Sequence, residues 1–154
     1  MSGLGLGAER GERREVASSA RVRAGRIVEV RARRLANRGD VELLDAQVFD
    51  AIRSAGPGAV ICADYRFVSP LSREVASGLS RGMRVANGGI VRGALLLDPA
   101  NTMFNLQVER VVRCAGNPAR RLFARLEELR EWVGGALTES ERHALRELFS
   151  GADH

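Results

Sequence analysis

The stretch Ala59–Ser72, AVICADYRFVSPLS, constrains the fold of this chain most strongly. Its first five residues form a continuous apolar run, which is typical of a β-strand covered on both faces. The run stops at Asp64, and a loop that contains Ser69 follows. In an open α/β sheet, the loop after a central strand is a common place for ligand binding and regulation. We therefore expect the rest of the chain to be arranged around this strand.

Periodic segments alternate with turn residues along the rest of the chain. Residues 21–33 have a period of two, which predicts strands with one solvated face at or near a sheet edge. Gly25 marks either a turn between two such strands or a bulge. Asp40 can cap a helix that runs to about Ala55 and ends at Gly56-Pro57-Gly58. The later segments predict helices over Arg73–Val85, Ala100–Ala115, from Leu126 and over Glu139–Ser150, and strands over Ile90–Leu97 and Arg120–Phe123.

This order predicts an α/β domain with a mostly parallel sheet of four or five strands. Helices are expected mainly on one face of the sheet, with an additional C-terminal helix. Residues 1–19 are rich in Gly, Arg, Glu and Ser and are expected to form a disordered or frayed tail. Residues 20–150 are expected to form a single domain, and residues 151–154 a second tail.

Composition narrows the class of protein. The chain has 154 residues, of which 45% are hydrophobic, and no apolar run approaches the roughly 18 residues that span a bilayer. The first residues contain no apolar stretch typical of a signal peptide. These features predict a cytoplasmic protein. Cys62 and Cys114 lie far apart, and we expect both to be buried thiols in a reducing compartment.

The charge is uneven along the chain. All 24 basic residues are arginine. Residues 1–38 hold ten arginines and four glutamates, a net charge of +6, whereas the remaining residues carry a net charge of −1. The Arg21–Arg38 segment could contact nucleic-acid phosphates. Its arginines alternate along a predicted strand and the chain has few aromatic residues, so a solvated strand face is the favoured interpretation.

The sequence contains no recognisable catalytic or metal-binding pattern. Its two histidines, His143 and His154, cannot be tied to a nucleophile. Cysteine, histidine and acidic residues are not clustered with metal-ligand spacing, and no phosphate-binding glycine loop follows a strand. We therefore predict a non-enzymatic protein without a metal or cofactor.

Five residues form the predicted binding region. Asp64 and Asp98 follow adjacent predicted strands, so their carboxylates could line one edge of the sheet. Ser69 and Ser72 precede a helix, where a phosphate on either serine would meet the helix dipole and Arg73. The simpler interpretation is that Ser72 only caps the helix and that both aspartates cap loops.

Several phrases of the sequence resemble a known family. The run GRIVEVRARRL, the stretch AVICADYRFVSPLS, then IVRGALLL, FNLQVERVVR and GNPARRLFARLEELREWV look like a STAS-type domain. The resemblance covers about Arg21–Leu137 and is to the divergent bacterial group related to anti-sigma-factor antagonists (SpoIIAA-like proteins). It implies a regulatory protein that binds a partner, such as a regulatory kinase or an anti-sigma factor, and some relatives bind small ligands.

In the antagonist members, a serine in an Asp-Ser-Ser-Gly phrase is phosphorylated at the start of the helix after the central strand. Asp64 matches that phrase, but the phrase itself does not occur here. Ser72 is nearest in position and Ser69 is second, so the resemblance implies these as the phosphorylation sites.

Together these observations predict a non-catalytic regulatory or scaffolding module. It would bind a partner protein, a structural assembly or a second copy of itself through the loop after the central strand and the following helix. The alternative is a domain that binds a small ligand or a lipid at the same strand ends. Nucleic-acid binding through Arg21–Arg38 is the least favoured hypothesis.

Overall fold

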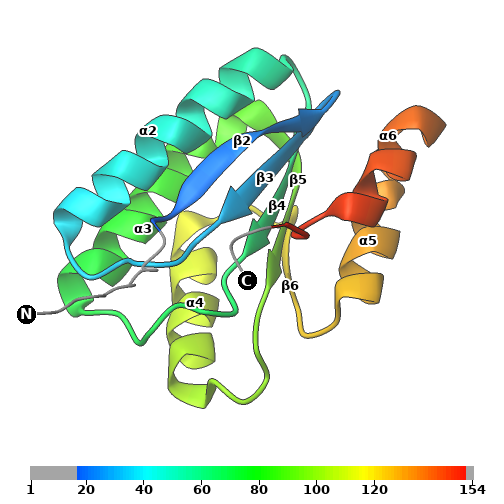
Figure 1. Cartoon of the computed structure of the whole chain (residues 1–154). Coiled ribbons are helices and arrows are strands. Elements are labelled where there is room, and N and C mark those ends of the chain that lie inside the picture. Colours follow the sequence, from blue (N-terminus) through cyan, green and yellow to red (C-terminus); the bar gives the residue numbers. More distant parts are fainter. Residues whose placement is uncertain (1–16, 152–154) are drawn as a thin grey trace, which may run out of the picture.

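The computed structural model describes residues 17–151 as an α/β domain built on one five-stranded sheet (Figure 1). Most of the predicted tails, residues 1–16 and 152–154, lie outside the described residues. The strands are β2 (Ser19–Ala24), β3 (Ile27–Arg31), β4 (Ala59–Asp64), β5 (Ile90–Leu96) and β6 (Arg120–Phe123). The helices are α2 (Arg38–Ala55), α3 (Arg73–Ala86), α4 (Thr102–Ala115), α5 (Leu126–Gly134) and α6 (Glu139–Ala144), with short 3₁₀ helices η1 (Asn87–Gly89) and η2 (Leu145–Glu147).

The strands lie in the order β2-β3-β4-β5-β6, which confirms the predicted mostly parallel sheet. β2 and β3 are antiparallel and joined by a turn at Gly25, whose φ is +53°, and the other neighbours are parallel. From β3 to β6, each connection leads to the neighbouring strand, so the chain crosses the sheet in one direction. Because such crossovers are right-handed, all three connecting helices come to lie on one face of the sheet. The β4 strand is central and apolar on both faces, as predicted.

Local signals place the helix ends close to their predicted positions. Ser72 caps α3 by accepting a hydrogen bond from the backbone N–H of Val75, at 3.1 Å. The predicted cap of α2 was wrong by three residues. Asn37 is the N-cap, and its side chain accepts from the backbone of Asp40 at 2.9 Å, while the Asp40 carboxylate accepts from Ala36. The helix begins at Arg38, so the backbone N–H of Asp40 is one of the free amides of its first turn, and Asn37 is the Asx residue placed to accept from it.

The two faces of the sheet carry separate cores. One core joins the sheet to α2, α3 and α4, with Val75, Phe104 and Val108 fully buried. The other core joins it to α5, α6 and η2, with Leu129, Leu145 and Leu148 buried. In Figure 1 the orange and red C-terminal segment lies on the opposite side of the sheet from α2, α3 and α4.

The predicted solvated face of β3 was wrong. Glu29 and Arg31 on that face are buried, with only 2% of Glu29 exposed. The C-terminal segment covers them, and the backbone N–H of Phe149 donates to the Glu29 carboxylate at 2.7 Å. Alternation showed the two faces of the strand correctly, but it could not show that a segment about 120 residues away covers the polar face.

The cysteine prediction was half right. Cys62 is buried and its pKa is raised to about 12 by burial and then by the nearby charge of Glu29. Cys114, in contrast, is exposed near the end of α4. Within residues 17–151, no helix combines the length and the hydropathy that crossing a membrane would require.

Candidate functional site

Asp64 lies at the carboxyl end of the central strand, at the predicted position, but its carboxylate is fully buried. Oδ1 accepts hydrogen bonds from Arg66 Nε at 2.8 Å and from the Arg66 backbone at 3.1 Å. Oδ2 accepts from Arg66 Nη2 at 3.0 Å and from Arg33 Nη2 at 3.3 Å. The carboxylate is therefore held between two guanidinium groups.

These contacts set the charge state of Asp64. Burial by itself would raise the pKa of the carboxyl, but the hydrogen bonds from Arg66 and the charges of Arg66 and Arg33 lower it below its usual value. Both guanidinium groups also stack on Phe67, with centroid distances of 4.8 Å from Arg33 and 5.1 Å from Arg66. Phe67 is exposed, so this cluster presents an aromatic ring to solvent at the rim of the sheet.

The loop between β4 and α3 is held by residues of α4 and the segment before it. Gln107 accepts from the backbone N–H of Leu71 at 2.7 Å and donates to its carbonyl at 2.8 Å. Asn101 donates to the carbonyl of Val68 at 3.0 Å. Because backbone groups at several points of the loop have fixed partners, α4 determines the position of the loop and of the start of α3.

The predicted serine positions lie on the exposed side of this loop. Ser69 and Ser72 are both exposed, and so is Arg73 in the first turn of α3. The Ser72 hydroxyl is engaged as the helix cap, which is the simpler of its two interpretations. The structure places the two serines and Arg73 in one exposed segment, while the Asp64 carboxylate is enclosed behind it.

Asp98 follows β5 and does not join the Asp64 cluster. Its Oδ1 accepts from the backbone N–H of Ala100 at 3.0 Å, and its carbonyl accepts from Asn105 at 2.9 Å. Asp98 therefore shapes the loop that enters α4, as the simpler interpretation predicted. The two aspartates occupy adjacent strand ends, but Asp64 binds Arg33 and Arg66 whereas the Asp98 carboxylate accepts from the backbone of its own loop.

A groove between α3 and α4 lies beside the predicted region and was not predicted. It has a volume of about 620 Å³. Met103 and Leu106 of α4 line it and are 64% and 62% exposed, respectively. Four arginines also line it and no acidic residue does: Arg73, Arg81, Arg84 and Arg110.

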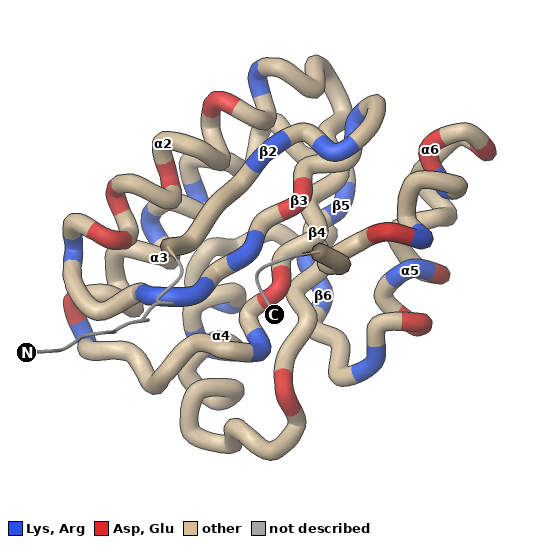
Figure 2. The backbone as a smooth tube through the Cα atoms, in the orientation of Figure 1, with Lys and Arg blue, Asp and Glu red and all other residues tan. Residues whose placement is uncertain are grey.

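The arginines of the Arg21–Arg38 segment form ion pairs with acidic residues of the same chain. Figure 2 shows acidic and basic positions interleaved around β2 and β3, without a single basic stripe. Each arginine in the segment lies within 3.5 Å of a carboxylate oxygen. The pairs are Arg21, Arg23 and Arg31 with Glu29, Arg26 with Glu141, Arg33 with Asp64, Arg34 with Asp40 and Arg38 with Glu74. This arrangement favours a structural role for these arginines over phosphate binding.

One sequence signal could have revealed the groove. Met103, Leu106 and Arg110 recur at helical spacing, so they form a second stripe on α4 beside the inner stripe of Phe104 and Val108. The pairing of Asp64 with Arg33 had no such signal, because the two residues are 31 positions apart in the chain. Among residues 17–151, no three histidine, cysteine or acidic side chains are grouped as ligands for a metal ion.

Comparisons of the chain with protein-family models, with curated proteins and with solved structures found no match.

Proposed function

We propose that this chain is a non-catalytic interaction module that binds an acidic amphipathic helix of a partner protein in the groove between α3 and α4. The observation that carries the proposal is the lining of that groove, which combines exposed apolar side chains of α4 with four arginines and no acidic residue. A helix that is apolar on one face and acidic along its margins complements this lining.

The exposed apolar side chains support a binding role. Exposed apolar side chains gathered in a concave surface mark interaction sites more often than scattered ones do. Met103 adds adaptability, because its flexible thioether can pack against differently shaped partners. The arginines around them would favour acidic partners and speed their encounter.

The loop after β4 would extend this surface. Arg73 belongs both to the groove and to the exposed segment that holds Ser69 and Ser72. A phosphate on Ser72 would add negative charge beside the arginines and would compete with an acidic partner. The partner suggested by the resemblance to STAS-type domains, a regulatory kinase or an anti-sigma factor, stays a prediction.

A photo-crosslinking experiment tests the proposal. Cys114 lines the groove and is exposed, whereas Cys62, the only other cysteine in the sequence, is buried. A thiol-reactive photo-crosslinker would therefore attach selectively at Cys114. After irradiation in a lysate of the source cells, mass spectrometry should identify one dominant adduct. Its crosslinked peptide should have apolar residues at helical spacing and flanking Asp or Glu.

Two variants make the result specific. Leu106→Glu places a charge in the groove at an exposed position and should abolish the adduct without changing the melting temperature. A control protein, Cys114→Ser with Glu128→Cys, carries the crosslinker on exposed α5 instead. If the control gives the same adduct, or if Leu106→Glu leaves the adduct unchanged, the groove is not the binding site.

A further inference from the structure

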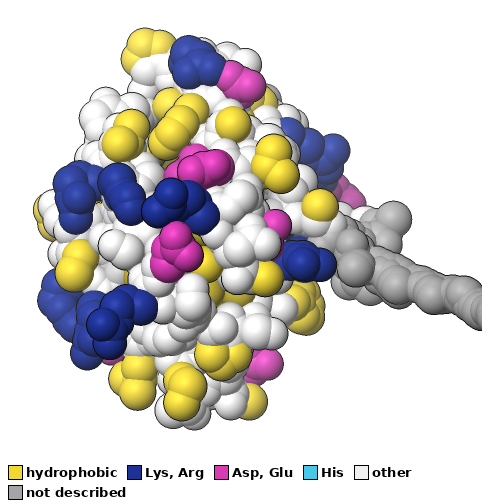
Figure 3. Space-filling view, turned by 90° about the vertical axis from the view of Figure 1, so that its left-hand side faces the viewer, with side chains coloured by type: hydrophobic (Ala, Val, Ile, Leu, Met, Phe, Trp, Pro, Cys, Tyr) yellow, Lys and Arg dark blue, Asp and Glu magenta, His cyan; other side chains and the backbone are white. Residues whose placement is uncertain are grey.

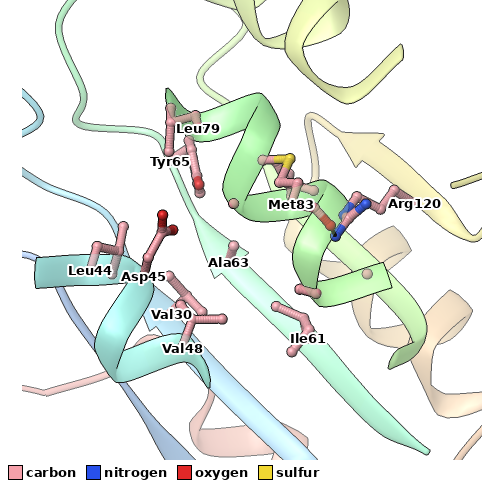
Figure 4. Close-up of a pocket in the computed structure, with 14 residues that line it drawn as sticks. Val30, Leu44, Asp45, Val48, Ile61, Ala63, Tyr65, Leu79, Met83 and Arg120 are labelled. Carbon is pink, nitrogen blue, oxygen red and sulfur yellow. Dashed lines mark hydrogen bonds between the residues drawn. The ribbon is translucent and has the colours of Figure 1, made fainter. Parts of the chain in front are cut away.

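A second concavity lies on the other side of α3, between α2, α3 and the sheet. It is a small cavity of about 60 Å³ with an apolar floor that includes Val30, Val48 and Ile61 (Figure 4). Asp45 and Gly82 line this cavity and also line an outer groove of about 430 Å³ between the two helices. The cavity and the groove therefore adjoin at these two residues. Figure 3, which views the side where α2 and α3 lie, shows hydrophobic, basic and acidic side chains close together on the surface.

Two polar groups meet at this junction without a hydrogen-bond partner among residues 17–151. In Figure 4 the Asp45 carboxylate and the Tyr65 hydroxyl point toward one another across the cavity. No other described residue forms a hydrogen bond or an ion pair with either group. Only 4% of Tyr65 is exposed, and the residue lines the cavity. A buried polar group of this kind normally has a partner, and here the cavity is where such a partner would lie.

The charges of the outer groove favour a cation, and Arg120, which lines the inner cavity, donates its hydrogen bonds to Asn87 and to the Met83 carbonyl. In the outer groove Arg38 pairs with Glu74 at 3.2 Å, which leaves Glu42, Asp45 and Arg81 with a net charge of −1. Burial raises the pKa of Asp45 to about 6, while the charge of Arg81 lowers it and that of Glu42 raises it. Burial likewise raises the pKa of Tyr65. The charge of Asp45 adds to that rise, and Arg120 from β6 opposes it.

Glycine at position 82 keeps the junction open. A Cβ at this position would lie 2.5 Å from both Asp45 carboxylate oxygens. Any larger residue would therefore displace the carboxylate from the space it shares with Tyr65. This close approach of α3 to Asp45 leaves room for a small group but not for another side chain of the helix.

We propose that this junction is a binding site for a small primary amine with a short alkyl chain. The ammonium group would donate hydrogen bonds to the Asp45 carboxylate and to the Tyr65 hydroxyl oxygen, and the alkyl chain would fill the apolar cavity. A cavity of roughly 150 Å³ accepts the six carbons of benzene, so this smaller one takes about two or three carbons of the chain, and the carbon that carries the ammonium group lies at the junction with the outer groove. The site is separate from the α3–α4 groove and does not depend on the interaction proposed there.

Nuclear magnetic resonance titration with isobutylamine, isobutanol and isobutyrate tests the proposal. At pH 7.5 isobutylamine should shift the amide signals of α2 and α3 around Asp45 and Gly82. Its dissociation constant should be about tenfold lower than that of isobutanol, because only the amine forms a charge-assisted hydrogen bond. Isobutyrate should not bind.

Variants and pH identify the groups responsible. Asp45→Asn should weaken amine binding about tenfold, and Tyr65→Phe should weaken it to a smaller extent. Asp50→Asn, an exposed change on the same helix, is the matched control and should have no effect. Amine binding should also weaken as the pH falls through about 6, where Asp45 becomes protonated.

Three results would overturn the assignment. One is equal affinity for isobutylamine and isobutanol, which would make the cavity an apolar void without selectivity. Another is amine binding that survives both Asp45→Asn and Tyr65→Phe. The third is the absence of amide shifts at every amine concentration that leaves the protein folded, which would assign the cavity to water alone. If Asp45→Asn does not fold, Tyr65→Phe and the pH series still decide among these results.

Discussion

The Glu141 carboxylate joins two parts of the chain that are 115 residues apart by pairing with Arg26 at 2.8 Å. It also accepts from the Arg26 backbone N–H at 3.0 Å. The same side chain completes the capping box of α6 by accepting from the backbone N–H of Thr138 at 2.9 Å. One carboxylate therefore starts the last helix and attaches it to the turn between β2 and β3.

Replacing this carboxylate should reduce stability in a pH-dependent manner. The hydrogen bond from Arg26 is the main cause that lowers the pKa of Glu141, to about 2, from 4.5. A carboxyl with a lowered pKa stabilises the folded state above its unfolded pKa and loses that contribution as the pH falls from about 4.5 to about 2. We expect Glu141→Gln to be less stable than the wild type at pH 7 and nearly equal to it at pH 2. Urea unfolding at both values measures this, and exposed Glu128→Gln should show no such difference.

Asp45 should show the opposite dependence. Its pKa is raised, so the folded state binds the proton more tightly than the unfolded state does. The associated stability is complete below about pH 3.8 and is lost as the pH rises through about 6. At pH 8, Asp45→Asn should therefore be more stable than the wild type by about 1–2 kcal/mol, after allowance for partial solvent screening. A difference in unfolding free energy that does not change between pH 4 and pH 8 would contradict this.

The contact between Gly82 and Asp45 predicts a coupled pair of substitutions. Gly82→Ala gains up to about 1 kcal/mol of helix propensity but forces its Cβ against the carboxylate. The crowding should cost about 1–3 kcal/mol, so the net effect should be destabilising. The double variant with Asp45→Ala removes the crowded carboxylate and should recover the loss. Thermal unfolding of the two single variants and the double variant gives a double-mutant cycle. If the stability changes of the two single variants simply add up in the double variant, the contact is refuted.

Ser72 should contribute stability through its cap. Ser72→Ala removes the acceptor for the Val75 amide and should cost about 1 kcal/mol. Ser69→Ala, in the same exposed loop, should change stability little. Ser72→Glu should also weaken binding to the crosslinked partner if phosphorylation there regulates binding, whereas Ser72→Ala should bind at least as well. If both variants bind as the wild type does, Ser72 acts only as a helix cap.

The C-terminal segment should behave as part of the core. Leu148 lies in the core on the α5 face of the sheet and is almost completely buried. Leu148→Ala should therefore cost about 2–5 kcal/mol, as truncation of a well-packed leucine does. Chemical denaturation measures the loss. Leu43→Ala, at an exposed position on α2, should cost less than 1 kcal/mol, and equal losses would mean that the segment does not stabilise the sheet.

Much of the fold could be predicted from local patterns. The strand at Ala59 and the cap at Ser72 depend on residues within about four positions, and the structure has both. Candidate sites were harder to predict. Asp64 was recognised from its place after an apolar run, but its enclosure by Arg33 was not, because that contact spans 31 residues.

By itself, the sequence determined the order and type of the elements and the mostly parallel sheet, because backbone preferences, caps and periodicity act over short distances. The tertiary structure decided which surfaces remain open. The C-terminal segment buried Glu29, the packing of α4 against α3 exposed Leu106 in a groove, and the approach of Gly82 to Asp45 lies at the edge of an apolar cavity. Such contacts join residues far apart in the chain, so they depend on the path of the whole backbone and leave no pattern in any one stretch of sequence.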